Sequence, residues 1–405
     1  MVSVKIWTEI SGERLAGNFT ALGRILQEAA GAAAPMALLA VVKANAYGHG
    51  IDPCAAILAA SGAEWLGVTD AHEGAKVRSL LASAGAAPDK QPEILVMSGT
   101  TGLEGEAACL VANRLTAVVW SAGHLEKLVE AARAAGHEAP LPVHLEVDTG
   151  MSRQGVRPGA ELDVLLSVLC REPRVALDGV FTHFASTEVA GSPQTAAQQA
   201  QFEAAIAQVA EAGLRPRWVH VGNSSYIDNG TADLASLRWL GSLAAGIGAR
   251  AMVRSGLALY GHLLPIEGAG HSLAAPTVHP VMTWKTRVIG VSEIPAGALV
   301  GYNGTFVAEY PMRLALLPVG YADGLRRELS ASDAGAGGWV MIRGERAPIV
   351  GRVSMNLTTV DVSAIDGAAE GDEAVLLGEG ITADDHARLA GTIAYEILCG
   401  VRTSQ

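Results

Sequence analysis

The sequence predicts an α/β protein with an N-terminal (β/α)8 barrel of the TIM type and a C-terminal, mostly-β domain. Three observations support this prediction. Short apolar runs alternate with Ala-rich stretches of helical period up to about Pro276, and beyond it short β runs are separated by Gly, Pro and Asp turns. The chain has 405 residues, half of them hydrophobic, which suffices for a barrel and a smaller module. We place the barrel at residues 11–275 and the mostly-β domain at 276–405, together with an N-terminal strand within residues 1–10.

Eight apolar runs have the length of buried strands. They are Ala37–Val42, Trp65–Thr69, Ile94–Met97, Ala117–Trp120, Val143–Val147, Leu177–Thr182, Trp218–Val221 and Ala251–Val253. Eight alternations of strand and helix are typical of a (β/α)8 barrel. A doubly wound sheet is the alternative, but no GxGxxG follows the first strand, which weakens a dinucleotide-binding interpretation.

The helices expected between these strands show an apolar face of helical period. They are Phe19–Ala30, Cys54–Ala60, Ala71–Leu81, His124–Ala135, Leu162–Cys170 and Ala197–Glu211, the last with a start signal at Pro193. The β runs expected in the second domain are Trp284–Val291, Leu314–Pro318, Trp339–Ile342, Thr358–Val362 and Ala374–Leu377. We expect the strand Val4–Glu9 to join them.

Charge and composition exclude several classes of protein. A net charge of −12 argues against nucleic acid or an anionic membrane as the main partner. The four cysteines lie far apart without metal-ligand spacing, so we expect buried thiols in a reducing compartment and no metal site. The N-terminus lacks the apolar core of a signal peptide, and Arg250 and Arg254 interrupt the most hydrophobic long window, Leu240–Leu259. We therefore expect a soluble, cytoplasmic protein.

The segment Val41–Gly50 is the most informative one, because it places Lys43 directly after a buried apolar strand. A partly desolvated lysine has a lowered pKa, which makes its neutral amine available for Schiff-base chemistry. Taken alone, the pattern also fits a surface lysine whose stem lies along the edge of the sheet.

Polar residues follow five of the predicted barrel strands. They are Lys43, Glu146–Arg153, His183, Asn223–Ser225 and Arg254–Gly256. Each one alone could be a loop cap or a surface group. Because active sites of such barrels lie at the C-terminal ends of the strands, five together indicate a catalytic site.

Nine segments, in the correct order and over nearly the whole chain, closely resemble signatures of the alanine racemases. They are Val41–Gly50, Asp148–Arg153, Thr182–Ala185, Asn223–Ser224, Val253–Gly261, Gly301–Tyr302, Val319–Gly324, Gly351–Asn356 and Ala394–Cys399. The resemblance implies an isomerase with the cofactor pyridoxal 5'-phosphate (PLP) that acts on a small amino acid. It also implies a homodimer with composite active sites and a role in supplying D-alanine for peptidoglycan.

The same resemblance implies two catalytic residues. Lys43 would bind PLP and act as acid and base on one face of the substrate, and Tyr302 of the partner subunit would act on the other. Racemisation needs two such groups, because one must remove the Cα proton on one face while the other delivers a proton to the opposite face. Since a phenol is a poor base at neutral pH, Tyr302 needs cationic neighbours, and Arg153 is the candidate. The alternative for Tyr302 is a packed strand aromatic.

Further roles follow by resemblance. Arg254 would donate to the pyridine nitrogen of PLP, which then stays unprotonated because an arginine does not give up its proton. His183 would orient Arg254, although it could instead be a core histidine. The expected phosphate ligands are Tyr47, Ser224, the backbone of Gly256 and Leu257, and Tyr395. Arg153 and the backbone of Met355 would bind the substrate carboxylate, and Tyr321 and Ile393 would form a narrow entrance.

Two positions depart from the family pattern. Glu146 stands where many alanine racemases carry a carbamylated lysine, and we hypothesise that its carboxylate holds Arg153 directly. Asn356 stands where aspartate is usual, which keeps a broad-specificity amino-acid racemase open as an alternative. The segment Tyr226–Ala251 is longer than the family usually shows. A non-catalytic PLP-binding barrel, a PLP decarboxylase of related fold and a PLP-free barrel hydrolase fit the motifs less well.

Overall fold

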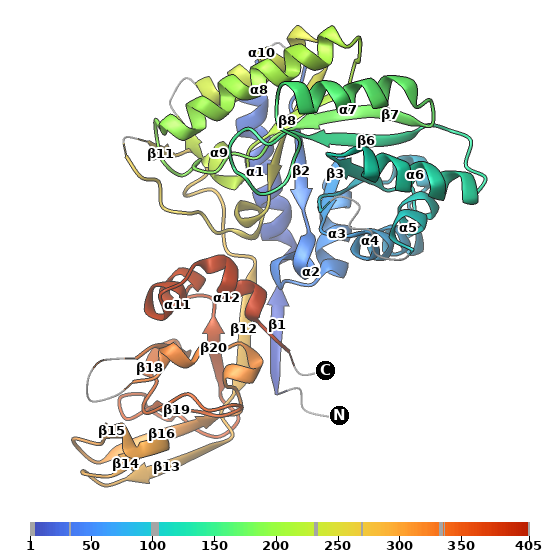
Figure 1. Cartoon of the computed structure of the whole chain (residues 1–405). Coiled ribbons are helices and arrows are strands. Elements are labelled where there is room, and N and C mark those ends of the chain that lie inside the picture. Colours follow the sequence, from blue (N-terminus) through green and yellow to red (C-terminus); the bar gives the residue numbers. More distant parts are fainter. Residues whose placement is uncertain are drawn as a thin grey trace. The chain divides into compact units, whose positions relative to one another are not determined.

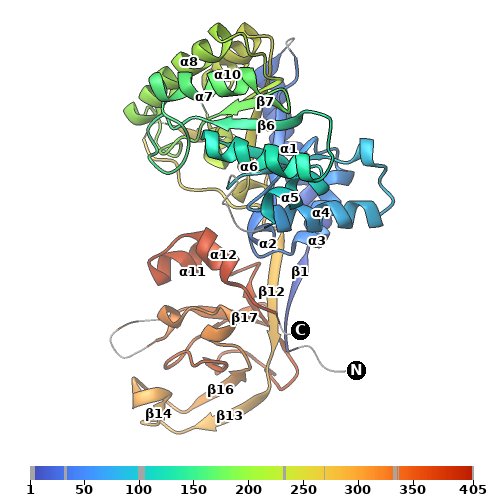
Figure 2. The same ribbon diagram turned by 45° about the vertical axis from the view of Figure 1, so that its right-hand side comes forward.

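The structure is a computed structural model that describes residues 5–31, 34–98, 105–230, 234–268, 270–331, 335 and 337–403. Its contacts divide the chain into two compact units, drawn from two sides in Figures 1 and 2. One unit consists of the described residues of Met1–Ser11, Tyr47–His49 and Pro280–Gln405, and we call it the β unit. The other consists of Gly12–Ala46 and Gly50–His279, and we call it the barrel unit.

The barrel unit contains a closed barrel of parallel strands in the order β10-β2-β3-β4-β5-β6-β7-β8. The strands are β2 (Ala37–Val41), β3 (Trp65–Val68), β4 (Glu93–Val96), β5 (Thr116–Val119), β6 (Leu141–Glu146), β7 (Val175–Phe181), β8 (Trp218–Val221) and β10 (Arg250–Ser255). Each predicted run overlaps one of these strands. The predicted (β/α)8 barrel is therefore confirmed.

Helices lie around the outside of the barrel (Figures 1 and 2). They include α1 (Gly12–Ala30), α3 (Ile51–Ala60), α4 (Ala71–Ser83), α5 (Glu106–Ala112), α6 (Ala122–Ala134), α7 (Ala160–Arg171), α8 (Pro193–Glu211) and α10 (Ala235–Gly246). Helix α8 begins at the predicted Pro193, and the Ser192 hydroxyl caps it by accepting from the Thr195 amide at 3.3 Å. Helices α5 and α10 were not among the expected ones. Helix α10, with the short α9 (Ser224–Asp228) and β9 (Asn229–Gly230), falls in the long Tyr226–Ala251 segment.

The β unit contains a five-stranded sheet in the order β1-β12-β20-β17-β18 and a three-stranded sheet in the order β13-β16-β19. The strands of these two sheets are β1 (Ile6–Ile10), β12 (Met282–Arg287), β13 (Gly290–Ile294), β16 (Met312–Leu317), β17 (Trp339–Ile342), β18 (Glu345–Pro348), β19 (Thr358–Asp361) and β20 (Glu373–Leu377). The prediction of a single strand over Trp284–Val291 is wrong, because β12 ends at Arg287 and β13 begins at Gly290 in a different sheet. Strand β18 and the helices α11 (Ala383–Ala390) and α12 (Ala394–Gly400) were also not expected.

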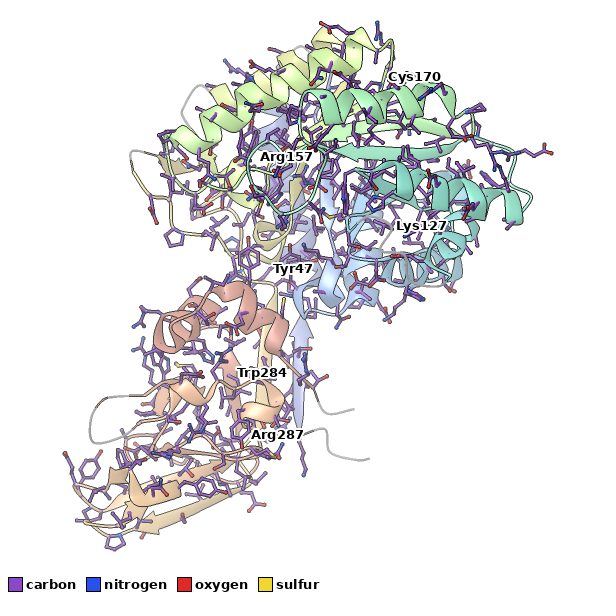
Figure 3. The ribbon with its side chains drawn as sticks, viewed as in Figure 1. Tyr47, Lys127, Arg157, Cys170, Trp284 and Arg287 are labelled. Atoms are coloured by element: carbon purple, nitrogen blue, oxygen red, sulfur yellow. The ribbon has the colours of Figure 1, made fainter. Side chains whose placement is uncertain are left out.

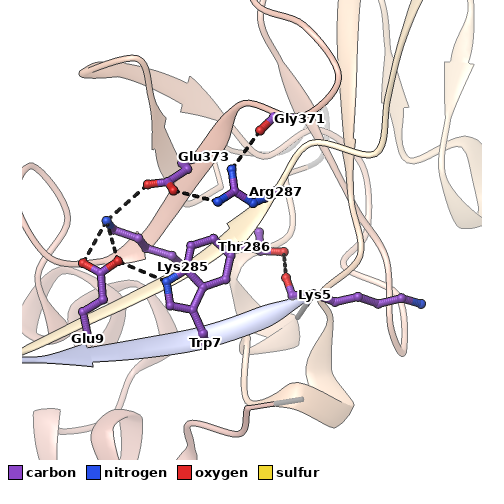
Figure 4. A network of polar contacts seen from close by, with 8 residues as sticks. All are labelled: Lys5, Trp7, Glu9, Lys285, Thr286, Arg287, Gly371 and Glu373. Carbon is purple, nitrogen blue, oxygen red and sulfur yellow. Dashed lines mark hydrogen bonds and ion pairs between the residues drawn. The ribbon is translucent and has the colours of Figure 1, made fainter. Parts of the chain in front are cut away.

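The N-terminal strand pairs antiparallel with β12, and side chains on three strands support this register (Figure 4). Lys285 of β12 lies between Glu9 of β1, at 2.9 Å, and Glu373 of β20, at 3.2 Å. These ion pairs are partly exposed and each contributes only about 0–1 kcal/mol. Burial of Trp284 on the same strand (Figure 3) weighs more, since truncating a buried tryptophan costs about 3–5 kcal/mol.

No helix among the described residues is long and apolar enough to span a membrane. The expectation that all four thiols are buried holds only for Cys54, since Cys109 and Cys399 are partly exposed and Cys170 is exposed on α7 (Figure 3). Helix α7 buries Leu162, Leu165, Leu166 and Leu169. The residue after Leu169 is rotated by about 100° around the helix, which turns it toward solvent.

Candidate active site

Lys43 follows β2, whose five residues are all buried, and it begins a short turn with unusual backbone geometry. The φ angles of Ala44, Asn45, Ala46 and Tyr47 are 53°, 54°, 55° and 54°, so four consecutive non-glycine residues are left-handed. This conformation costs about 1–2 kcal/mol per residue. Asn45 offsets part of the cost, since its backbone amide donates to Glu73 at 3.2 Å and its side-chain oxygen accepts from the Ile51 amide at 2.9 Å. The lysine thus leaves the strand into a tightly constrained turn, as is common at functional sites.

Replacing exposed Ala44 with glycine is expected to leave the free energy of unfolding unchanged or to raise it by up to about 1 kcal/mol. Glycine removes the left-handed penalty of about 1–2 kcal/mol but adds about 0.5–1 kcal/mol of chain entropy to the unfolded state. The matched control is Ala204→Gly on the exposed side of α8, which should lower stability by about 1 kcal/mol. Urea denaturation of both variants measures the difference. Equal destabilisation by both would contradict the left-handed geometry.

A cavity of about 120 Å³ lies in the barrel unit and brings several of the sequence-predicted residues together. It is lined by Lys43, Thr69, Met97, Ser98, Glu146, Arg153, Gln154, Phe181, His183 and Arg254. These residues come from the C-terminal ends of barrel strands and from the loops that follow them. The structure therefore places Lys43, Arg153, His183 and Arg254 around one space.

Arg254 of β10 is buried, and each of its partners is a hydrogen-bond acceptor. Its Nη2 donates to the Thr182 carbonyl at 2.8 Å and lies 3.2 Å from His183 Nδ1, and its Nη1 lies 3.0 Å from His220 Nδ1. Burial lowers the pKa of Arg254 to about 10, so the guanidinium is still charged at neutral pH.

Both histidines around Arg254 are neutral. Burial, with the charges of Arg254, Arg153 and Lys43, lowers the pKa of His183 to about 3. Burial, with His144 and Arg254, lowers the pKa of His220 well below its usual value. Sequence reasoning included His183 but missed His220. A polar residue in the otherwise apolar strand Trp218–Val221 was the signal that could have indicated it.

Ser224 lies at the start of α9, and its hydroxyl oxygen accepts hydrogen bonds from backbone amides of the segment that follows β10. Its Oγ accepts from the amides of Gly256 at 3.2 Å and Ala258 at 3.1 Å, and lies 3.1 Å from the Ser255 hydroxyl. The residue that caps α9 is Asn223, whose side-chain oxygen accepts from the Tyr226 amide at 3.1 Å. Hydroxyls and backbone N–H groups that converge in this way suit an anionic oxygen ligand such as a phosphate.

The remaining predicted residues belong to the β unit. The rings of Tyr47 and Tyr395 lie with their centroids 5.9 Å apart, and burial raises the pKa of Tyr47. By contrast, Tyr302 and Met355 are 68% and 56% exposed. Tyr321 and Ile393, expected at the entrance, are also exposed.

Glu146 contacts Gln154, while Arg153 acts on it through its charge and makes no ion pair with it among the contacts of the described residues. The Gln154 amide donates to the Glu146 carboxylate and, at 3.0 Å, to the Met97 carbonyl. Asp148 Oδ1 accepts three successive backbone N–H groups at 3.0 Å, from residues 150–152, and this tight turn directs Gln154 toward Glu146 and leaves Arg153 exposed. Burial raises the pKa of Glu146 to about 7, although Gln154 and the charges of Arg254 and Arg153 act in the opposite direction.

Glu146→Gln is expected to raise the free energy of unfolding by about 2–3 kcal/mol at pH 8 and by little at pH 4. In the wild type, folding raises the pKa of Glu146 from 4.5 to about 7, so stability falls as pH rises through this window and stays reduced above it. Glutamine removes this penalty. Urea denaturation at the two pH values measures it, with Glu161→Gln on the exposed side of α7 as control. A gain of the same size at both pH values would contradict the raised pKa.

No group of three or more His, Cys, Asp or Glu side chains that could hold a metal ion is found within the part of the chain that the structure describes. Lys43 and Arg254 are among the charged residues that line the cavity. A lysine, a buried guanidinium and converging N–H donors form a donor set for an anionic cofactor that is attached through an amine.

Comparison with known proteins gives a consistent result. Residues 17–264 match the family model "Alanine racemase, N-terminal domain" and residues 281–404 match "Alanine racemase, C-terminal domain". An alanine racemase of Symbiobacterium thermophilum is 37% identical over 399 residues, covering 98% of this chain and 94% of that protein.

Solved structures agree with this result. The alanine racemase of Streptomyces coelicolor superposes with a TM-score of 0.83 at 33% identity, over 98% of this chain and 96% of the other. The alanine racemase of Bartonella henselae, solved with covalently bound pyridoxal phosphate, has a TM-score of 0.77 at 26% identity, over 98% of this chain and 97% of the other.

Proposed function

The chain belongs to the alanine racemase family, and on that premise we propose that it interconverts L-alanine and D-alanine with PLP as its cofactor. The observation that carries the proposal is the placement of Lys43 and the charged, buried Arg254 around one cavity. The likeness to a racemase solved with covalently bound PLP supports the choice of cofactor.

We assign the residues that would hold PLP as follows. The Lys43 amine would provide the covalent attachment, and the Arg254 guanidinium would donate to the pyridine nitrogen. The Ser224 hydroxyl and the backbone of Gly256 and Leu257 would bind the phosphate, and Tyr47 and Tyr395 would be further phosphate ligands by resemblance. The backbone amides of Gly256 and Ala258, which donate to the Ser224 hydroxyl oxygen, support this assignment. A phosphate oxygen could take the place of that hydroxyl oxygen as their acceptor, so that neither N–H would be left unsatisfied.

When bound, PLP supplies an electron sink that acidifies the substrate Cα–H. The protein must then remove the Cα proton from one face of a planar centre and deliver a proton to the other face. The Lys43 nitrogen acts on one face, and the oxygen of the partner subunit's Tyr302 acts on the other. Arg254 takes no proton itself, since a guanidinium donates hydrogen bonds without losing its charge. Its three acceptors hold it in place for this role.

Substrate binding would use the Arg153 side chain and the Met355 backbone N–H as partners of the carboxylate. Arg153 lines the cavity with Lys43, and its charge there suits an amino-acid carboxylate.

We further propose a homodimer in which each active site takes Tyr302 and Met355 from the partner subunit. Both side chains are exposed, by 68% and 56%, and are therefore accessible to a second subunit. A role in supplying D-alanine for peptidoglycan, in the cytoplasm, follows from family membership as part of the same proposal.

A broad-specificity amino-acid racemase is the second candidate. Asn356 favours it, because its neutral amide replaces the anion usual at this position. Its Nδ2 lies 3.4 Å from the Asp323 carboxylate, so a negative charge remains nearby.

The two candidates are separated by incubating the PLP-loaded protein with L-alanine, L-serine, L-lysine or L-arginine and quantifying each D-enantiomer by chiral chromatography. Formation of D-alanine with little of the others is expected. D-lysine or D-arginine at comparable rates would establish the broad-specificity enzyme instead, and no D-amino acid at all would reject both.

A further inference from the structure

A row of polar side chains runs through the barrel interior, away from the cavity. Beyond Arg254, His220 Nε2 lies 2.8 Å from His144 Nδ1, and His144 Nε2 faces Asp178 Oδ2 at 3.6 Å. Asp178 makes a two-pronged ion pair with Arg217, whose Nη2 donates at 2.8 Å. Both histidines are fully buried, whereas the Arg217 side chain is 61% exposed. The row thus connects the buried Arg254 with solvent at the other end of the barrel.

The surrounding strands make room for this row. A Cβ at Gly179 would lie 2.7 Å from two atoms of the His144 ring and 2.8 Å from a third, so a larger residue there would displace the ring. The register of β6 and β7 shifts between Val143 and His144, which leaves Asp178 as the extra residue of a bulge. Bulges re-aim side chains, and this one turns the Asp178 carboxylate toward the row.

Aromatic rings enclose both imidazoles. Phe181 stacks on His220 with centroids 4.4 Å apart, and Trp65 packs against His144 at 5.0 Å. Burying two imidazoles in such a place is costly unless their polar atoms are paired, so their arrangement requires an explanation.

The ends of the row determine where each proton lies. Arg254 can only donate, so His220 Nδ1 must be the acceptor and His220 carries its proton on Nε2. That proton is donated to His144 Nδ1, which places the proton of His144 on Nε2, facing the Asp178 carboxylate. If His144 carried a proton on both nitrogens, its Nδ1–H would donate to His220 Nε2. His220 would then carry its own proton on Nδ1, and this N–H would face the Arg254 guanidinium, which is also a donor. Burial favours the neutral forms, since it lowers the pKa of both rings.

We propose that His144 and Asp178 are positioning residues that fix the tautomer of His220 and thereby the orientation of Arg254. The carboxylate selects the Nε2–H form of His144, and His144 then offers His220 an acceptor. Without Asp178, His144 can adopt the Nδ1–H form, which makes His220 carry its proton on Nδ1 and repel the Arg254 guanidinium. The charged groups that face the row are Arg254, Asp178, Arg217 and, at longer range, Glu93.

The effect on catalysis rests on the proposed role of Arg254 beside PLP, but the tautomers can be measured without it. Long-range ¹H–¹⁵N correlation spectra of the full chain labelled in the histidine rings distinguish Nδ1–H from Nε2–H. We expect Nε2–H for both His144 and His220 in the wild type. His386, a buried histidine of the β unit, serves as an internal control for folding.

Three variants test the proposal. Asp178→Ala should shift His144 and His220 away from the pure Nε2–H form. It should also lower kcat for alanine by about 10-fold, which is a small effect for a residue that supports a site without touching the substrate, and leave KM nearly unchanged. His144→Leu should act in the same way, whereas His144→Asn should preserve the His220 tautomer, because its amide oxygen can take the place of Nδ1. The His386 signals should stay at their wild-type positions in all three.

Nδ1–H on either histidine in the wild type would overturn the proposal. So would an unchanged His220 tautomer in both Asp178→Ala and His144→Leu, or altered tautomers with unchanged kcat. Predicted tautomers in a protein without racemase activity would uphold the assignment of the two histidines and reject the proposed function, so the two failures are distinguishable.

Discussion

Lys43→Ala is expected to lower the rate of alanine racemisation by about 10⁴-fold or more and to abolish covalent retention of PLP. The variant loses both the amine that attaches the cofactor and the group that exchanges the proton on one face of the substrate. Lys43 follows a fully buried strand and lines the same cavity as Arg254, so no solvent-exposed lysine can take its position. Chiral analysis measures the rate, and mass spectrometry after borohydride reduction measures PLP attached to the protein.

The matched control is Lys127→Ala, which removes an exposed lysine on α6 (Figure 3). It should retain the wild-type rate and the PLP label. Wild-type activity in Lys43→Ala, or a label that remains on another lysine with full activity, would contradict the assignment.

Tyr302→Phe is expected to lower racemisation by about 10²–10⁴-fold, the usual contribution of a positioned acid or base. Because Lys43 is untouched, the variant should keep PLP and should still exchange the Cα hydrogen of one alanine enantiomer with heavy water. Exchange of the other enantiomer should be lost. Proton magnetic resonance of each pure enantiomer follows the disappearance of its Cα–H signal.

Tyr310→Phe is the control, since Tyr310 is also exposed and its hydroxyl donates to Asp361 at 3.3 Å. It should exchange both enantiomers at wild-type rates. Equal loss of exchange for the two enantiomers in Tyr302→Phe would show that the tyrosine does not act on a single face. The two-base mechanism would then be wrong.

Much of the fold could be predicted because buried parallel strands have a simple signature. Runs such as Ala37–Val42 and Ile94–Met97 are apolar without interruption, and each became a barrel strand. Where the apolar pattern continues through a turn, it misleads. Residues Trp284–Val291 look like one strand, but the chain turns at Val288 and Ile289 and forms two strands in different sheets. Short helices such as α12 are set by tertiary packing, which a local pattern does not contain.

The candidate site was less predictable than the barrel. Residues next to strand ends, such as Lys43 and Arg254, could be found because the topology brings those ends together. His144, Asp178 and His220 could not, because their contacts join residues 34–76 positions apart and depend on a bulge and on the absence of a side chain at Gly179. The contact of Glu146 with Gln154 was not predicted for a similar reason, since it depends on a turn whose three N–H groups are bound by Asp148.

The measurement that tests the central claim most directly is the incubation of PLP-loaded protein with L-alanine in heavy water. Because enantiomers have equal free energy, a racemase must bring the solution to equal amounts of L- and D-alanine and then stop. We predict this endpoint, with solvent deuterium at Cα of the D-alanine that forms first. L-alanine that stays unchanged, or that is converted into a product other than its enantiomer, would contradict the proposed function.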